Sequence, residues 1–464
     1  MEASRETESE NVLGTAPIGK LLRQFALPSV ISMVVNALYN IVDQIFIGRG
    51  VGYLGNGGTN VIMPYMVLCI GFGLLFGDGC AAYFSMEMGR GNEKEASRGV
   101  ANAVVGMVVV GLIMGAFCRI FNERLCWLTG ATETLLPYAM EYGSIIFLGF
   151  PFSMYSAGTA SLIRADGSPK WSMAGLMTGC IVNIVLDYVF VFPLGMGMSG
   201  AALATIIGQG LNAFIYFLYM FRFKHVTLKK SYWKPSLSYM KRITRLGVSS
   251  MVTQISVVII MIVTNRVMTK YGADSIYGSE IPMTAFGIVQ KVNNILTSIM
   301  IGIGAGALPI IGYNFGAEKY DRVKKTILMS VGVGMLCGLV ATFFFQFMPE
   351  TILSIFGTES DLYMEFAVKA MRIFLMLCIL DGVNNVIPTC FQAVGKPGFS
   401  AGASLMRNVG FNVPPILILP IFVGVTGALW NGPIAMAASF VMNLILVRKL
   451  FKELDQKAAV RAKG

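Results

Sequence analysis

Carboxylate and amide side chains recur at helical spacing inside strongly apolar stretches of the chain. Asn36, Asn40 and Asp43 occupy positions i, i+4 and i+7 of one stretch, and Asn183 and Asp187 occupy i and i+4 of another. This spacing puts each set on one face of a helix. An ionisable group at the centre of a bilayer costs at least ~2.5 kcal/mol on insertion scales, so each carboxylate calls for an explanation. We expect the two faces to meet in a polar pocket.

A third apolar stretch carries Thr205, Gln209 and Asn212 at i, i+4 and i+7. Polar side chains of this kind can simply join helices through hydrogen bonds. Two carboxylates in one pocket favour a different role, because they cannot both ionise cheaply and one then binds a proton more readily. The same oxygens would also suit Na⁺, which prefers hard oxygen ligands. The predicted cation-coupling residues are Asp43, Asn183, Asp187, Thr205, Asn36 and Asn40, with H⁺ or Na⁺ as the ion.

The composition places these stretches in a membrane protein. Of 464 residues, 55% are hydrophobic and 13% charged, against roughly 25% charged in soluble proteins, and the mean hydropathy is +0.67. The single histidine, His225, excludes a multi-histidine metal site. The eight cysteines form no C-x-x-C pair, and no phosphate-binding G-x-x-x-x-G-K-[ST] loop occurs. We therefore expect no enzyme, no cofactor, no resident metal and no ATPase subunit.

Apolar runs between charged or Pro/Gly breaks predict twelve transmembrane helices, each near the length of about 20 residues that a bilayer requires. The first six cover roughly 24–47, 58–86, 98–118, 134–157, 169–192 and 200–221, and the second six roughly 244–268, 282–311, 323–346, 362–390, 399–421 and 425–449. The expected fold is an all-α polytopic membrane protein.

The distribution of Lys and Arg predicts the orientation of these helices. With both termini in the cytoplasm, the cytoplasmic segments carry 27 Lys and Arg residues and the outer loops carry seven, as the positive-inside rule requires. The most basic loop, 222–245, is typical of a segment beside anionic membrane lipid, and we expect no nucleic-acid partner.

Three matched segments indicate an internal repeat. GRGNEKEASRGV (89–100) aligns with NFGAEKYDRVKK (314–325), RADGSPKWSMAG (164–175) with QAVGKPGFSAGA (392–403), and MSGAALATI (198–206) with VTGALWNGP (425–433), all at offsets of 225 to 228. Two six-helix halves with an even number of helices are parallel repeats related by pseudo-two-fold symmetry, an arrangement that places a cavity between the halves. The predicted domains are an N-lobe at 1–221, a basic linker at 222–243 and a C-lobe at 244–464.

The chain resembles the multidrug and toxic compound extrusion (MATE) transporters, in the segments VDQIFIGRG (42–50), RADGSPKWS (164–172), NIVLDYVF (183–190), GAALAT (200–205) and PIIGYNFGAEKYDRV (309–323). The similarity extends from about Leu21 to Arg448 and looks closest to the bacterial MepA-like and DinF-like branches. It implies a two-lobed exporter in a bacterial cytoplasmic membrane, which exchanges H⁺ or Na⁺ for organic compounds that are often cationic. It also implies that Asp43, Asn183, Asp187 and Thr205 form an N-lobe cation site.

The second half offers fewer candidates. Asp381 lies in the tenth predicted helix with Asn384. Lys291 and Arg407 could hold Asp381 in a buried ion pair, or Asp381 could attract a cationic substrate. Asp78, between glycines, marks either a close approach of helices or the border of a cleft. Together with Gln209, Gln254 and Lys291, these residues are candidates for the substrate cleft. Adaptable and aromatic side chains suit a site of broad specificity, and the candidates of this kind are Met33, Tyr39, Met63, Tyr65, Phe150, Met154, Met177 and Met261.

These observations predict a monomeric secondary transporter that exports small organic, mainly cationic compounds by alternating access, in exchange for H⁺ or Na⁺. The alternative is a flippase or exporter of a lipid-linked or other endogenous metabolite.

Overall fold

The computed structural model describes residues 12–278, 280–355 and 360–463, which fold into helices with no strand among them. The first half contains α1 (Val12–Thr15), α2 (Ile18–Gly50), α3 (Tyr53–Gly89), α4 (Glu93–Ile120), α5 (Asn122–Leu128), α6 (Leu136–Ile146), α7 (Phe150–Ala165), α8 (Pro169–Val191) and α9 (Gly197–Met220). The second half contains α10 (Leu237–Ala273), α11 (Glu280–Gly316), α12 (Tyr320–Phe347), α13 (Pro349–Ser354), α14 (Asp361–Phe374), α15 (Asp381–Ala393), α16 (Pro397–Leu405), α17 (Val413–Val423) and α18 (Asn431–Lys463).

Ten helices of the described residues are long and apolar enough to cross a membrane. One of these ten, Pro397–Val460, covers both the predicted spans 399–421 and 425–449. The predicted span 362–390 is not among the ten, because it is divided into the shorter α14 and α15. Every predicted span thus has a helical counterpart, and the prediction of an all-α chain is confirmed.

Several of the helices are interrupted by short irregular turns. Between α14 and α15 the chain forms a short 3₁₀ turn, Cys378–Leu380. After α16 it forms a π-helical turn, Met406–Gly410, and Pro414 and Pro415 then open α17, where a missing N–H costs nothing. Membrane helices tolerate such breaks when neighbouring helices cover the freed backbone groups.

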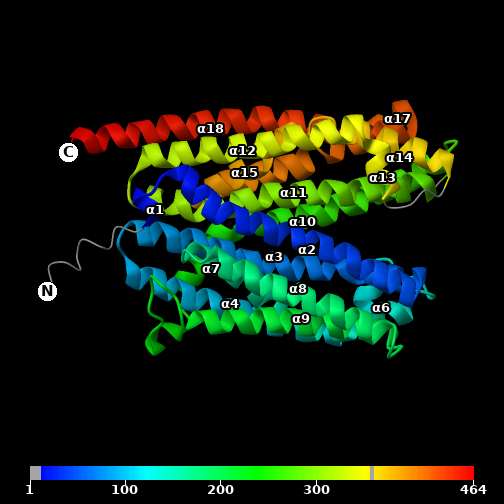
Figure 1. Cartoon of the computed structure of the whole chain (residues 1–464), viewed down its shortest axis with the longest axis horizontal. Coiled ribbons are helices and arrows are strands. Elements are labelled where there is room, and N and C mark those ends of the chain that lie inside the picture. Colours follow the sequence, from blue (N-terminus) through cyan, green and yellow to red (C-terminus); the bar gives the residue numbers. More distant parts are fainter. Residues whose placement is uncertain (1–11, 279, 356–359, 464) are drawn as a thin grey trace.

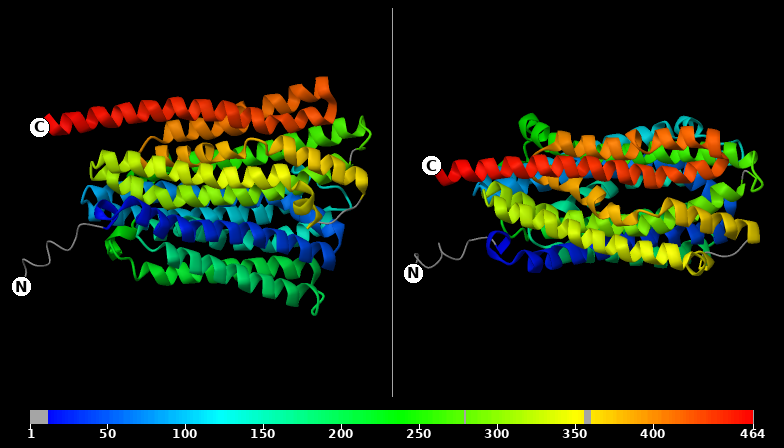
Figure 2. Two further views of the ribbon diagram at one scale, coloured as in Figure 1. Left: turned by 45° about the horizontal axis from the view of Figure 1, so that its top comes forward. Right: turned by 90° about the horizontal axis from the view of Figure 1, so that it is seen from above.

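The long helices lie side by side, with the two halves of the chain on opposite sides of the bundle. Figure 1 shows α3, α4 and α7–α9 on one side and α10–α18 on the other, and α1 and the C-terminal end of α18 lie at the same end of the bundle. Figure 2 shows the same arrangement from two further directions. A chain that crosses the membrane an even number of times must begin and end on the same side of it.

Two seams join the halves, one between α3 and α10 and the other between α2 and α11. Glycines permit the close approach at both seams. A Cβ added at Gly79 would overlap the Ile243 carbonyl oxygen, and one at Gly306 would overlap the backbone of Ala26. Small residues of this kind let membrane helices pack backbone to backbone.

Large apolar side chains are exposed on the outer faces of the bundle. On α4 they include Ile113 at 64% and Phe117 at 53% exposed, and on α12 they include Leu336 at 62%. A water-soluble protein rarely exposes apolar surface on this scale. Together with the long apolar helices, this surface makes the chain a multi-pass membrane protein.

Candidate functional site

A compact polar cluster lies inside the first half, where α2, α8 and α9 meet. The Asp43 and Asp187 carboxyl groups lie close enough for their charges to interact. The Asn183 Nδ2 donates to the Thr205 Oγ1 at 3.4 Å. Asp187 is 0% exposed and Asn183 and Thr205 are each 2% exposed. The structure therefore brings together all four residues of the predicted core of the coupling site.

Four buried oxygens of this cluster lack donors. Asp43 Oδ1, both oxygens of Asp187 and Asn183 Oδ1 are buried without a hydrogen-bond partner. Buried polar atoms are nearly always satisfied, because an unpaired one forfeits its hydration. Two ionised carboxylates are acceptors only and cannot satisfy each other. A proton shared between them or a cation bound by their oxygens would remove the deficit.

Two tyrosines complete the cluster. Tyr39 on α2 and Tyr142 on α6 both lie close enough to Asp43 and Asp187 to interact with their charge, and both lie near Thr205. The sequence predicts Tyr39 only for the substrate cleft and does not single out Tyr142, since no polar spacing marks it within its apolar helix. Each hydroxyl is a hydrogen-bond donor in the neighbourhood of the carboxylate pair.

The other predicted polar residues of the first half lie outside this cluster. Asn40 Nδ2 donates to the backbone oxygen of Asn36 at 2.7 Å and to its side-chain oxygen at 3.1 Å, and Asn40 is exposed. These two amides therefore bond to each other, and their part in coupling stays a prediction. Gln209 is half-buried with its Oε1 beside Gly149. Asn212 is buried with its side-chain oxygen unpaired.

Asp78 cross-links the two halves instead of lying free in a cleft. Its carboxylate accepts a hydrogen bond from Ser161 on α7 at 2.6 Å and another from Ser250 on α10 at 2.8 Å. Arg164, 5% exposed and missed by the sequence analysis, donates to the same Ser161 at 2.7 Å. Gln392 on α15 donates to Ser250 at 3.4 Å. Of the two predicted roles, this conformation therefore favours the close approach of helices.

The candidates of the second half are dispersed. Asn384 donates to the Met436 carbonyl at 3.0 Å and accepts from Asn443 at 3.0 Å, so it ties α15 to α18. Asp381 is 6% exposed, and Arg407 lies near enough to interact with its charge. Among the described residues, however, no ion pair within 4 Å joins Asp381 to Arg407 or Lys291, so the expected buried ion pair is not formed. Lys291 is exposed, and Gln254 lies at the α3–α10 seam beside Gly71.

The predicted apolar cleft residues divide into two groups. Tyr65, Phe150 and Met154 belong to the core of the first half and not to a cleft, since their side chains are buried and the Tyr65 hydroxyl donates to the Leu125 carbonyl at 2.9 Å. The other candidates are half-buried or exposed, and their role in the cleft stays a prediction; they are Met33, Tyr39, Met63, Met177 and Met261.

Comparison with known protein families assigns the chain to a family. The family model described as MatE matches the chain twice, over residues 28–189 and 249–418. The chain belongs to the MatE family. The two matches fall one in each half, as a duplicated fold requires. Membership confirms the resemblance to MATE transporters and, with it, the expectation that the chain is no enzyme.

Relatives within the family cover almost the whole chain. The "Multidrug export protein MepA" of Staphylococcus aureus strain MSSA476 is 25% identical over 438 residues, which is 93% of this chain and 94% of that protein. The protein of the same name from Staphylococcus haemolyticus is 25% identical over 442 residues, again 93% and 94% of the two chains.

Solved structures share the fold of this MatE chain. An outward-facing multidrug resistance MATE transporter of the MOP superfamily matches with a TM-score of 0.90 at 20% identity, over 96% of this chain and 98% of that one. A MOP superfamily transporter from Pyrococcus furiosus, described as having a binding pocket of reverse polarity, matches with a TM-score of 0.89 over the same shares. These matches confirm the twelve-helix, two-lobed architecture.

Proposed function

We propose that this MatE chain is a secondary active exporter of organic, mainly cationic compounds, which it exchanges for H⁺ or Na⁺ by alternating access. The observation that carries the proposal is the Asp43–Asp187 pair, in which Asp43 Oδ1 and both Asp187 oxygens are buried without a donor. The names of the staphylococcal relatives support the multidrug part of the proposal.

The coupling ion binds at the carboxylate pair. As a proton, it is shared between Asp43 and Asp187 and removes their mutual repulsion. As Na⁺, it takes oxygens of these two carboxylates together with Asn183 Oδ1 and Thr205 Oγ1, a set of hard ligands that fits this cation. The residues present accommodate either ion.

The position of α2 explains how ion binding alters the bundle. This helix packs against α8 of its own half and against α11 of the other half. An ion that draws Asp43 on α2 towards Asp187 on α8 shifts the balance between these two contacts. Pro28 inside α2 removes one backbone hydrogen bond and so eases bending of the helix. Ion binding thereby opens the seam between the halves and releases the exported compound.

Orientation and surroundings follow from the same features. The chain works as a monomer in a bacterial cytoplasmic membrane, with both termini in the cytoplasm. The shared end of the bundle at which the termini emerge (Figure 1) and the concentration of Lys and Arg in the segments at that end support this orientation.

The test is ethidium export from proteoliposomes under an imposed pH gradient or an imposed Na⁺ gradient. Wild type should export under one gradient, and Asp187→Asn should lose that export. Asp274→Asn, which changes an exposed aspartate at the end of α10, is the matched control and should export like wild type. Absence of gradient-driven export of any organic cation would contradict the proposal and favour the alternative of a flippase for an endogenous metabolite. Full export by Asp187→Asn would contradict the role of the carboxylate pair.

A further inference from the structure

A cavity lined by both halves lies where α3 ends and α10 begins, at the end of the bundle that carries the chain termini. Its volume is about 430 Å³. The first half contributes Tyr83, Met86, Glu87 and Arg90, and the second half contributes Arg242, Arg245, Leu246, Gly395 and Pro397. Neither the ion site nor the Asp78 cross-link shares a residue with this cavity.

The lining has an apolar floor and a basic rim. Tyr83, Met86 and Leu246 are buried, whereas the arginine side chains of the rim are exposed. Three guanidinium groups around one cavity suit an anion that offers paired oxygens, and phosphate and carboxylate groups both bind guanidinium through two oxygens. The apolar floor suits a ligand that also carries a hydrocarbon portion.

The single carboxylate in the lining is already satisfied. Glu87 accepts from Arg90 at 2.6 Å through one oxygen and from Asn92 at 2.9 Å through the other. Its charge therefore does not oppose an incoming anion as a free carboxylate would. Arg245 has no carboxylate within 4 Å among the residues that the structure describes, and so its charge is available to a ligand.

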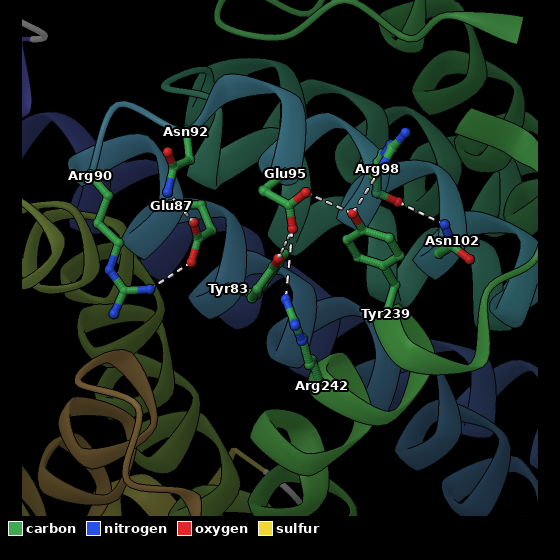
Figure 3. A network of polar contacts seen from close by, with 9 residues as sticks. All are labelled: Tyr83, Glu87, Arg90, Asn92, Glu95, Arg98, Asn102, Tyr239 and Arg242. Carbon is green, nitrogen blue, oxygen red and sulfur yellow. Dashed lines mark hydrogen bonds and ion pairs between the residues drawn. The ribbon is translucent and has the colours of Figure 1, made fainter. Parts of the chain in front are cut away.

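A network beside the cavity fixes the position of Arg242. Figure 3 shows Tyr83 and Tyr239 converging on Glu95, with donor–acceptor distances of 3.2 Å and 2.8 Å. Arg242 lies 3.6 Å from the same carboxylate. This network joins α10 to α3 and α4 and holds the Arg242 side chain at the rim, next to Tyr83.

The α15–α16 turn adds a further feature that attracts anions. Pro397, in the cavity wall, is the first residue of the nine-residue helix α16. The first turn of a helix leaves backbone N–H groups without intrahelical partners, and the helix dipole favours negative charge there. Arginine side chains and a helix N-terminus thus face one space from different elements.

The depth of the cavity indicates the source of the anion. Arg90 lies just beyond the predicted span 58–86, and Arg242 lies just before the predicted span 244–268. Residues just outside an apolar span lie at the level of the lipid phosphate groups. Met86 and Leu246 lie at or just inside the ends of the spans, at the level where the lipid hydrocarbon begins. We propose that the cavity binds the phosphate group of an anionic phospholipid from the adjacent leaflet. Because the lining comes from both halves, the bound phosphate holds them together at this end.

The test measures phosphatidylglycerol binding to the purified full-length protein in detergent, by native mass spectrometry and by thermal unfolding. Dioleoyl-phosphatidylglycerol should bind and raise the melting temperature, whereas dioleoylglycerol, which lacks the phosphate, should do neither. Arg245→Gln should weaken phosphatidylglycerol binding about tenfold, as expected for the loss of a charge-assisted contact. Lys94→Gln, which removes an exposed cation at the same end of the bundle but outside the cavity, should bind like wild type.

Inorganic phosphate distinguishes the source of the anion. If millimolar phosphate stabilises wild type but not Arg245→Gln, and phosphatidylglycerol has no effect, the site takes a soluble phosphate and the lipid assignment is overturned. Equal binding of phosphatidylglycerol by wild type and Arg245→Gln, or equal binding of phosphatidylglycerol and dioleoylglycerol, would overturn the proposal altogether. Arg90→Gln/Arg242→Gln provides a second variant should Arg245→Gln unfold. None of these measurements depends on export.

Discussion

Replacing Asp187 by asparagine should stabilise the ligand-free protein while it abolishes ion-coupled export. Both Asp187 oxygens are buried without a donor, and the neighbouring Asp43 offers none when ionised. Asparagine removes one negative charge and supplies an N–H donor to Asp43. A buried polar group left unsatisfied costs about 1–3 kcal/mol, and relief of that cost should raise the melting temperature by a few degrees.

The assay is thermal unfolding of purified Asp187→Asn in detergent without Na⁺, followed by intrinsic fluorescence. The stabilisation should be larger at alkaline pH, where wild type lacks a proton between its carboxylates, than at acidic pH. Asp274→Asn should melt like wild type, because that carboxylate is exposed. A fall of several degrees for Asp187→Asn would refute the reasoning, since it would mean that protein donors already hold the carboxylate.

Three other changes test the remaining parts of the account. The hydrogen bond to Asp166 raises the pKa of His225. This contact should therefore stabilise the protein at acidic pH, and the stabilisation should be lost as the pH rises through the raised pKa. The melting temperature of His225→Gln should lack that pH-dependent loss. Asp78→Ala should lower the melting temperature by removing the acceptor of the buried Ser161 hydroxyl and of the half-buried Ser250 hydroxyl, whereas an unchanged melting temperature would argue against a structural cross-link. Tyr142→Phe should reduce gradient-driven ethidium export with little change in thermal stability, and unaltered export would place its hydroxyl outside the coupling chemistry.

Helix positions are largely predictable from this sequence because a bilayer demands long apolar runs. The exception is the predicted span 362–390, where the chain turns between α14 and α15. No glycine or proline lies between Phe374 and Asp381, so the local sequence contains no helix-breaking residue that would predict this break. The break depends on how neighbouring helices pack, and the pattern of apolar residues along one helix carries no information about that packing.

The candidate site is predictable only where periodicity and charge coincide. Asp43, Asn183, Asp187 and Thr205 stand out as polar residues on apolar helix faces, and the structure brings them together. Tyr142 has no such signature, because an aromatic residue in a membrane helix is equally compatible with lipid, core or site. Phe150 and Met154 are predicted to line the substrate cleft for the same reason, and the structure buries both in the hydrophobic core.

The binding of ethidium to purified protein, measured across a range of pH and of Na⁺ concentration, tests the central claim most directly. If the ion and the drug bind antagonistically through the Asp43–Asp187 pair, linkage requires each to weaken the other by the same factor. We predict that the ethidium affinity of wild type falls as H⁺ or Na⁺ rises, and that the affinity of Asp187→Asn no longer responds. An ethidium affinity that is independent of both ions in wild type would contradict the account.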